Sequence, residues 1–159
     1  MMCHMDREQL LERLPVKRRL FGEMFLLGNL LQTAGDSFYE EITCKQFFFL
    51  ICLSLFREDP PTLKELSELM GTSHQNVKQI ALKLERKGFI SILRDKNDHR
   101  KLRLAPTEKY REMKVNYFQQ EKGFMELLFG DVGQEEAASA YSTMVKIEKN
   151  LRRYEEARS

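Results

Sequence analysis

The segment from Thr62 to Leu104 constrains the fold of this 159-residue chain more than any other part of it. It opens at 62–65 with Thr-Leu-Lys-Glu, a hydroxyl side chain followed three residues later by a carboxylate, which is the pattern of a helix-capping box. Gly71 then stands where a left-handed residue can end a short helix, and Ser73 can cap a second one. The order helix, glycine turn, helix is that of a helix-turn-helix.

The second helix of this pair is amphipathic and is followed by a hairpin. Its apolar residues recur at the spacing i, i+3, i+4, i+7, which places them on one helical face. They are Val77, Ile80, Ala81 and Leu84. After Gly88, two runs at about 89–94 and 101–104 are typical of strands, and they flank a polar turn at 95–100. The segment therefore predicts a winged helix-turn-helix.

Long helices are expected on both sides of this segment. Helical spacing of apolar residues predicts one from about 16 to 39, preceded by a short helix over about 6–14. Thr43 can cap an apolar and therefore central helix to about Arg57. Thr107 can cap another to about Phe129, and a last helix is expected at about 134–156. The expected fold is mainly α with a small β-hairpin wing.

The chain has the length of a single domain, residues 1–159. A winged helix-turn-helix lobe would occupy about residues 43–106, and a helical dimerisation region about 6–40 and 107–157. Long amphipathic helices at both ends of a small domain have little of that domain to pack against. A second copy of the chain is therefore the expected partner, with an intramolecular helical bundle as the alternative.

Positive charge is concentrated in the same segment. The formal net charge is only +2, but from Thr62 to Ala105 ten Lys/Arg stand against five Asp/Glu. That segment is therefore +5 and the remainder −3. A basic middle indicates a surface for a polyanion, although an ordinary solvated surface is the alternative for charge asymmetry alone.

The outward face of the second helix carries side chains suited to the major groove of DNA. Amide side chains near a helix N-terminus can bond adenine at N6 and N7. The residues expected to contact DNA from this helix are Ser73, His74, Gln75, Asn76, Lys78, Gln79 and Lys83.

The turn of the hairpin has no apolar residue and should project into solvent or onto DNA. Lys96, His99 and Arg100 are the wing residues expected at DNA, with Arg100 in the minor groove, whose negative potential favours arginine. Arg94 and Asp98 are expected to orient the wing. For Asp98 the reason is that phosphates would repel its carboxylate, so it is better suited to hold an arginine than to contact DNA.

Three stretches resemble the MarR family of bacterial transcriptional regulators: Thr43-x-x-Gln46-Phe47, Leu-Glu-Arg-Lys-Gly-Phe at 84–89, and Arg94 through Arg100 followed by Leu104-x-x-Thr107. The resemblance covers most of the chain. It implies a triangular homodimer, joined by its terminal helices, that binds pseudo-palindromic operator DNA and is often released by a small ligand or by oxidation. We expect the chain to act as a repressor, with an activator as the alternative. Asn97 and Gln79 depart from the family pattern, which commonly has basic residues there.

The three cysteines form no disulfide framework, so a reducing, cytoplasmic location is expected. Cys44, near a helix N-terminus, is the candidate for a redox-active thiolate, although a buried structural thiol is the favoured interpretation. The pair Cys3-His4 is a second candidate for redox or metal chemistry but has no other obvious ligands. No metal and no cofactor is therefore expected.

No phosphate loop, paired-carboxylate site or nucleophile–base set is apparent, which argues against an enzyme. The most apolar run, 47–56, is about half a membrane span and fits a buried helix, so no membrane partner is expected. The expected partners are double-stranded DNA, a second copy and a small-molecule effector whose site the sequence does not identify. A winged helix that binds protein instead of DNA, and a thiol-based redox-sensing regulator, are the alternatives.

Overall fold

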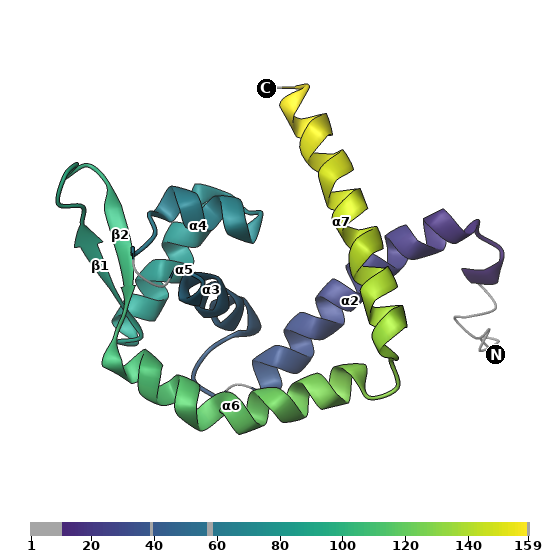
Figure 1. Ribbon diagram of the computed structural model, residues 1–159, viewed down its shortest axis with the longest axis horizontal. Helices are drawn as coiled ribbons and strands as arrows, with labels where there is room; N and C mark the ends of the chain where they lie inside the picture. The colour runs from purple at the N-terminus through teal and green to yellow at the C-terminus, as the bar shows by residue number, and fades with distance from the viewer. Residues whose placement is uncertain (1–10, 39, 57–58, 159) are drawn as a thin grey trace, which may run out of the picture. The chain divides into compact units, whose positions relative to one another are not determined.

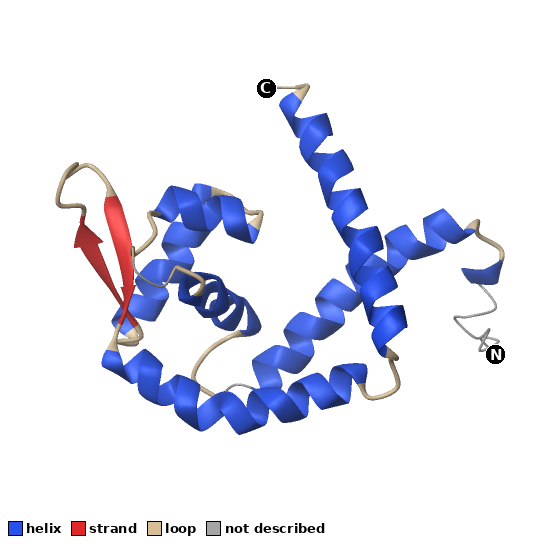
Figure 2. Ribbon diagram, viewed as in Figure 1, coloured by secondary structure: helices blue, strands red, loops and turns tan. Residues whose placement is uncertain are grey.

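The computed structural model describes residues 11–38, 40–56 and 59–158. The chain divides into two compact units, Met1–Arg111 and Glu112–Ser159. Helices make up most of the chain, and the described residues contain one sheet, a two-stranded antiparallel hairpin (Figure 2). The mainly helical fold with a hairpin wing is thereby confirmed, and the first unit contains the whole of the expected lobe.

Two helices, α2 (Val16–Phe38) and α3 (Cys44–Ser54), open the first unit. Most of the short helix expected over 6–14 lies outside the described residues. Helix α3 starts where expected, because Thr43 and Gln46 form a capping box. The Thr43 hydroxyl accepts from the Gln46 N–H at 3.2 Å, and the Gln46 side chain accepts from the Thr43 N–H at 3.2 Å.

Helix α3 corrects two expectations. It ends at Ser54 rather than near Arg57, because the N–H groups of Leu55 and Phe56 bond the carbonyls three residues back and tighten the last turn. It is also buried on one side only. Its residues Phe49, Leu50, Cys52 and Leu53 are in the core, whereas Phe48, Ile51 and Leu55 are exposed. The rest of the first unit therefore packs against only one face of α3.

The helix-turn-helix consists of α4 (Leu63–Met70) and α5 (His74–Arg86), as predicted (Figure 1). Gly71 ends α4 at φ 63°, in the left-handed region that favours glycine. Ser73 caps α5, since its hydroxyl accepts from the Asn76 N–H at 3.2 Å. These local signals fix the direction in which α5 leaves the turn.

The wing is formed by β1 (Ile90–Arg94) and β2 (Leu102–Pro106), paired antiparallel with Ile90 opposite Pro106 and Arg94 opposite Leu102. Strand β2 runs two residues further than the sequence indicated, because pairing with the start of β1 continues to Pro106. On its other side, the Leu104 N–H donates to the Pro61 carbonyl at 2.9 Å. The linker before α4 therefore lies along β2.

The core of the first unit lies beneath α5. Helix α5 contributes Val77, Ile80, Ala81 and Leu84, all buried as the spacing predicted. They are joined there by Phe49, Leu50, Leu53, Leu66, Phe89 and Leu104 from the neighbouring elements. Because one face of α5 is used entirely in this core, its opposite face must point to solvent.

The C-terminal helices are α6 (Glu108–Phe129) and α7 (Gln134–Glu156), with the bounds expected. The Thr107 hydroxyl caps α6 by accepting from the Tyr110 N–H at 3.4 Å. Helix α7 has no buried residue, and its apolar side chains Tyr141, Met144, Leu151 and Tyr154 are exposed. In the described part of the chain, no helix combines the length and apolarity needed to cross a membrane.

Candidate nucleic-acid interface

The outward face of α5 presents the polar residues that the sequence assigned to DNA. Ser73, His74, Gln75, Asn76, Lys78, Gln79 and Lys83 are all exposed. The Asn76 amide is held in place, because its Nδ2 donates to the Thr72 hydroxyl at 3.0 Å. Its carbonyl oxygen and second amide hydrogen stay available, so Asn76 can still offer a donor and an acceptor to a base edge.

The wing is braced by a buried carboxylate at the base of its turn. Asp95 is buried and accepts from the N–H groups of Asn97 and Asp98, each at 2.8 Å. It also forms an ion pair with the Arg103 guanidinium on β2. The hydrogen bond from Arg103 and the two backbone N–H bonds lower the pKa of Asp95 to about 2.

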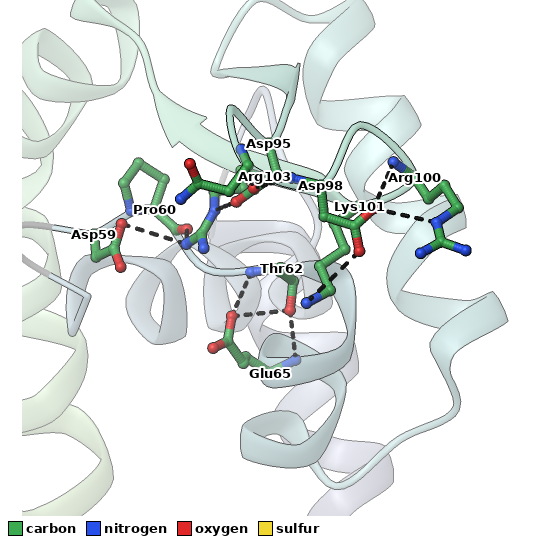
Figure 3. A network of polar contacts seen from close by, with 10 residues as sticks. Asp59, Pro60, Thr62, Glu65, Asp95, Asp98, Arg100, Lys101 and Arg103 are labelled. Carbon is green, nitrogen blue, oxygen red and sulfur yellow. Dashed lines mark hydrogen bonds and ion pairs between the residues drawn. The ribbon is translucent and has the colours of Figure 1, made fainter.

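Arg103 joins the wing to the linker that precedes α4 (Figure 3). Its Nη1 donates to the Pro60 carbonyl at 2.7 Å and lies 3.3 Å from an Asp59 carboxylate oxygen. One guanidinium thus connects the turn of the hairpin, through Asp95, to the segment from which the helix-turn-helix begins. The wing and α4 are therefore held as one body.

At the tip of the wing, Asp98 faces a basic side chain. Its carboxylate accepts from both the backbone N–H of Arg100, at 3.1 Å, and the Arg100 Nε, at 3.3 Å. Lys96, His99 and Arg100 are exposed, as is Arg94 at the end of β1. Among the described residues, Arg94 makes no ion pair. Asp98 contacts Arg100 and Lys101 within the tip, whereas Asp95 and Arg103 connect the turn to the linker before α4.

A cleft of about 680 Å³ separates the wing from the helix-turn-helix. Basic side chains dominate its lining, with two glutamates on α4. The residues with charged or titratable side chains are Lys64, Glu65, Glu68, His74, Lys78, Arg100, Lys101 and Arg103. Thus the expected DNA contacts His74, Lys78 and Arg100, from two different elements, border the same cleft.

The two glutamates of the cleft are engaged with their neighbours. The Glu65 carboxylate accepts from the Thr62 N–H at 2.7 Å and from its hydroxyl at 2.8 Å, and these bonds lower the pKa of Glu65. Glu68 lies 3.9 Å from the Lys64 ammonium. Since Lys64 and Lys101 remain mostly exposed, the cleft is an electropositive groove suited to a phosphodiester chain.

Sequence reasoning did not assign Asp95, Arg103, Lys64 or Lys101 to this interface. For Arg103, one signal was present: it alternates along β2 with the buried Leu104, next to a turn that contains aspartates. The positions of the two lysines depend on how the wing stands against α4, which local sequence does not specify.

The thiol candidate Cys44 has an environment opposite to that of a stabilised thiolate. Burial, and the nearby Asp36 carboxylate, raise the pKa of the Cys44 thiol. The candidate pair Cys3-His4 lies outside the described residues. Where the structure describes the chain, no group of three or more His, Cys, Asp or Glu residues could hold a metal ion.

Comparison with known proteins agrees with this geometry. Residues 42–102 match the model of the MarR family. This segment is a MarR-family domain. It spans α3 to the start of β2, and so contains the capping box, the helix-turn-helix and the turn of the wing. No curated protein matches the chain.

Solved structures share the fold well beyond this segment. A MarR protein from Peptoclostridium difficile is 24% identical, with a TM-score of 0.75 over 85% of this chain and 88% of that one. A MarR/EmrR family regulator from Acinetobacter is 17% identical, with a TM-score of 0.76 over 88% and 99%. MepR of S. aureus, solved in complex with DNA, is 18% identical, with a TM-score of 0.73 over 82% and 97%.

Proposed function

We propose that this chain is a DNA-binding transcriptional regulator that reads a pseudo-palindromic operator as a homodimer. The carrying observation is the electropositive cleft between the wing and the helix-turn-helix. On one side of it lies the exposed polar face of α5, and on the other the basic tip of the wing. With α5 in the major groove and Arg100 in the adjacent minor groove, the intervening sugar-phosphate strand crosses the cleft.

In this arrangement the contacts divide by role. Gln75, Asn76 and Gln79 read base edges, while Lys78, Lys83 and the wing residues Lys96 and His99 bind the backbone. Lys64 and Lys101 add two further phosphate ligands from the cleft. MepR, of the same fold, was solved bound to DNA, which supports DNA as the partner here.

A second copy is needed to read two half-sites, and the exposed apolar side chains favour one. Helix α7 exposes Tyr141, Met144, Leu151 and Tyr154, and α2 exposes Phe21 and Phe25. Large exposed apolar patches mark interaction surfaces. We infer that the terminal helices form the dimerisation region, so that the recognition helices enter major grooves about 10 bp apart. Release by a small molecule is an expectation of the family resemblance, and repression rather than activation is our own expectation; both stay predictions.

Selection of bound duplexes from a random pool tests this proposal, together with sedimentation equilibrium for the mass in solution. The expected result is a two-fold-symmetric sequence bound by a dimer, with an affinity that falls steeply with salt. A strictly monomeric protein would contradict the dimer. Absence of salt-dependent duplex binding would contradict the function and favour a protein-binding winged helix.

A further inference from the structure

The C-terminal end of the recognition helix α5 is fastened on two sides by polar contacts. Lys87, which follows α5 directly, extends its ammonium to the loop between α2 and α3. There it donates to the Glu41 carbonyl at 2.6 Å and to the Gln46 side-chain oxygen at 3.1 Å. Gln46 is buried and belongs to the capping box of α3. The end of α5 is therefore attached to the start of α3.

Lys109, in the first turn of α6, completes the attachment. Its ammonium lies 3.0 Å from the Glu41 carboxylate and donates to the Lys87 carbonyl at 3.1 Å. It also lies 4.4 Å from the ring centroid of Phe89, a core residue. A cation at the carbonyl end of a helix is favourable, so Lys109 both caps α5 and pairs with Glu41.

These residues, Glu41, Lys87 and Lys109, form what we call the clasp. Its members come from three separate parts of the first unit: the loop after α2, the end of α5 and the start of α6. Glu41 takes part twice: its backbone carbonyl accepts from the Lys87 ammonium, and its carboxylate pairs with the Lys109 ammonium. Loss of the carboxylate would leave the Lys109 charge without its ion-pair partner at the end of α5. The loop after α2 and the start of α6 are thereby tied to the end of α5 at a single point.

We propose that the clasp is a positioning device that sets the direction of α5 relative to α2, with Glu41 and Lys109 as the positioning residues. Its functional consequence rests on the proposed dimeric DNA binding. If α2 belongs to the dimerisation region, the clasp restricts the distance between the two recognition helices of the dimer to a narrow range. A dimer that lacks the clasp contacts would then also bind operators with altered half-site spacing.

The test uses Glu41→Gln, which keeps the shape and removes the charge, and Lys109→Met, which keeps the stem over Phe89. Two measurements are made on the full chain. The first is the width of the distance distribution between spin labels on non-natural amino acids at Gln32 in α2 and Arg86 in α5. The second is the ratio of affinities for the preferred operator and for operators lengthened or shortened by one base pair.

Both variants are expected to broaden the distance distribution and to reduce the spacing ratio roughly two- to fivefold, the range that half-exposed ion pairs support. The double variant should lose little more than either single one, because both remove the same pair. Lys109→Arg keeps the positive charge opposite Glu41, so its spacing ratio should stay close to that of the wild type. A purely structural role would weaken binding to every spacing equally and leave the ratio unchanged.

Glu108→Gln is the matched control. Glu108 pairs with Arg111 at 2.7 Å within the first turns of α6, so its pair joins no second element, and neither measurement should change. Unchanged distance distributions in the clasp variants would overturn the inference even if the protein binds its operator normally. A wild-type protein without any spacing preference would instead contradict the proposed function. The distance measurement would still show whether the clasp positions α5 relative to α2.

Discussion

The buried Asp95 carboxylate forms an ion pair with Arg103 across the base of the wing, and Arg103 in turn donates to the Pro60 carbonyl. This relationship connects the turn of the hairpin to the linker that opens the helix-turn-helix (Figure 3). A wing braced at its base can present Arg100 at a fixed place beside α5. Preorganised contacts of this kind reduce the ordering cost of binding.

The Asp95–Arg103 pair predicts a stability change at low pH. The pKa of Asp95 is lowered from 3.8 to about 2 in the fold. Because the folded-state value is the lower one, the stabilisation is fully present above pH 3.8 and is lost as the pH falls through about 2. Thermal melts of the wild type and of Asp95→Asn should therefore differ most above pH 3.8 and converge toward pH 2. A difference in melting temperature that stays constant over the whole pH range would contradict a stabilising Asp95–Arg103 pair. The control is Asp131→Asn, which changes a carboxylate on an exposed loop.

Lys64 and Lys101 are predicted to bind backbone phosphates. Lys64→Ala and Lys101→Ala should each weaken binding equally on all duplex sequences, because phosphates carry no sequence information. Each should also lower the slope of log affinity against log salt by about 0.9, the counterion release of one phosphate contact. Titrations at several salt concentrations measure both. Lys45, exposed on α3 and outside the lining of the cleft, provides the control Lys45→Ala. Slopes equal to that of the wild type would exclude the cleft from the interface.

The exposed amides of α5 are predicted to read bases. Gln75→Ala and Asn76→Ala should each change base preference at one position per half-site, by about 1–3 kcal/mol. Selection from a random pool with each variant reports the position. Arg100→Ala should instead leave base preference in the major groove intact and lower the salt slope. Uniform weakening by the amide variants would show that they do not read sequence.

The elements of the first unit were predictable because their signals are local. The burial of Val77, Ile80, Ala81 and Leu84 follows from helical periodicity, and capping residues mark the starts of α3, α4 and α5. The exposed DNA-contact candidates follow as the opposite face of α5. The early end of α3 was missed, because nothing in the apolar run 47–56 signals the tighter last turn.

The bracing of the site could not be predicted in the same way. Asp95 begins a turn that the sequence indicates to be fully solvated, and Arg103 lies eight residues further on, in β2. Their contact depends on the register of the hairpin. Arg103 and Pro60 are separated by 43 residues, and Lys87 and Glu41 by 46. Such contacts arise from the packing of whole elements against one another, on which local sequence patterns carry no information.

The close approach of α2 and α3 gives a last prediction, on stability. Gly35 is buried, and a Cβ at this position would lie 2.6 Å from the Cys44 Sγ and 2.7 Å from its Cβ. Gly35→Ala should therefore destabilise the fold by about 1–3 kcal/mol, as overpacking does, seen as a lower urea midpoint. Cys44→Ala would remove only the sulfur, whereas Cys44→Gly removes both clashing atoms. Gly35→Ala should lower the free energy of unfolding much less in a Cys44→Gly background than in the wild type. An equal loss in both backgrounds would show that the two helices do not contact each other at this pair.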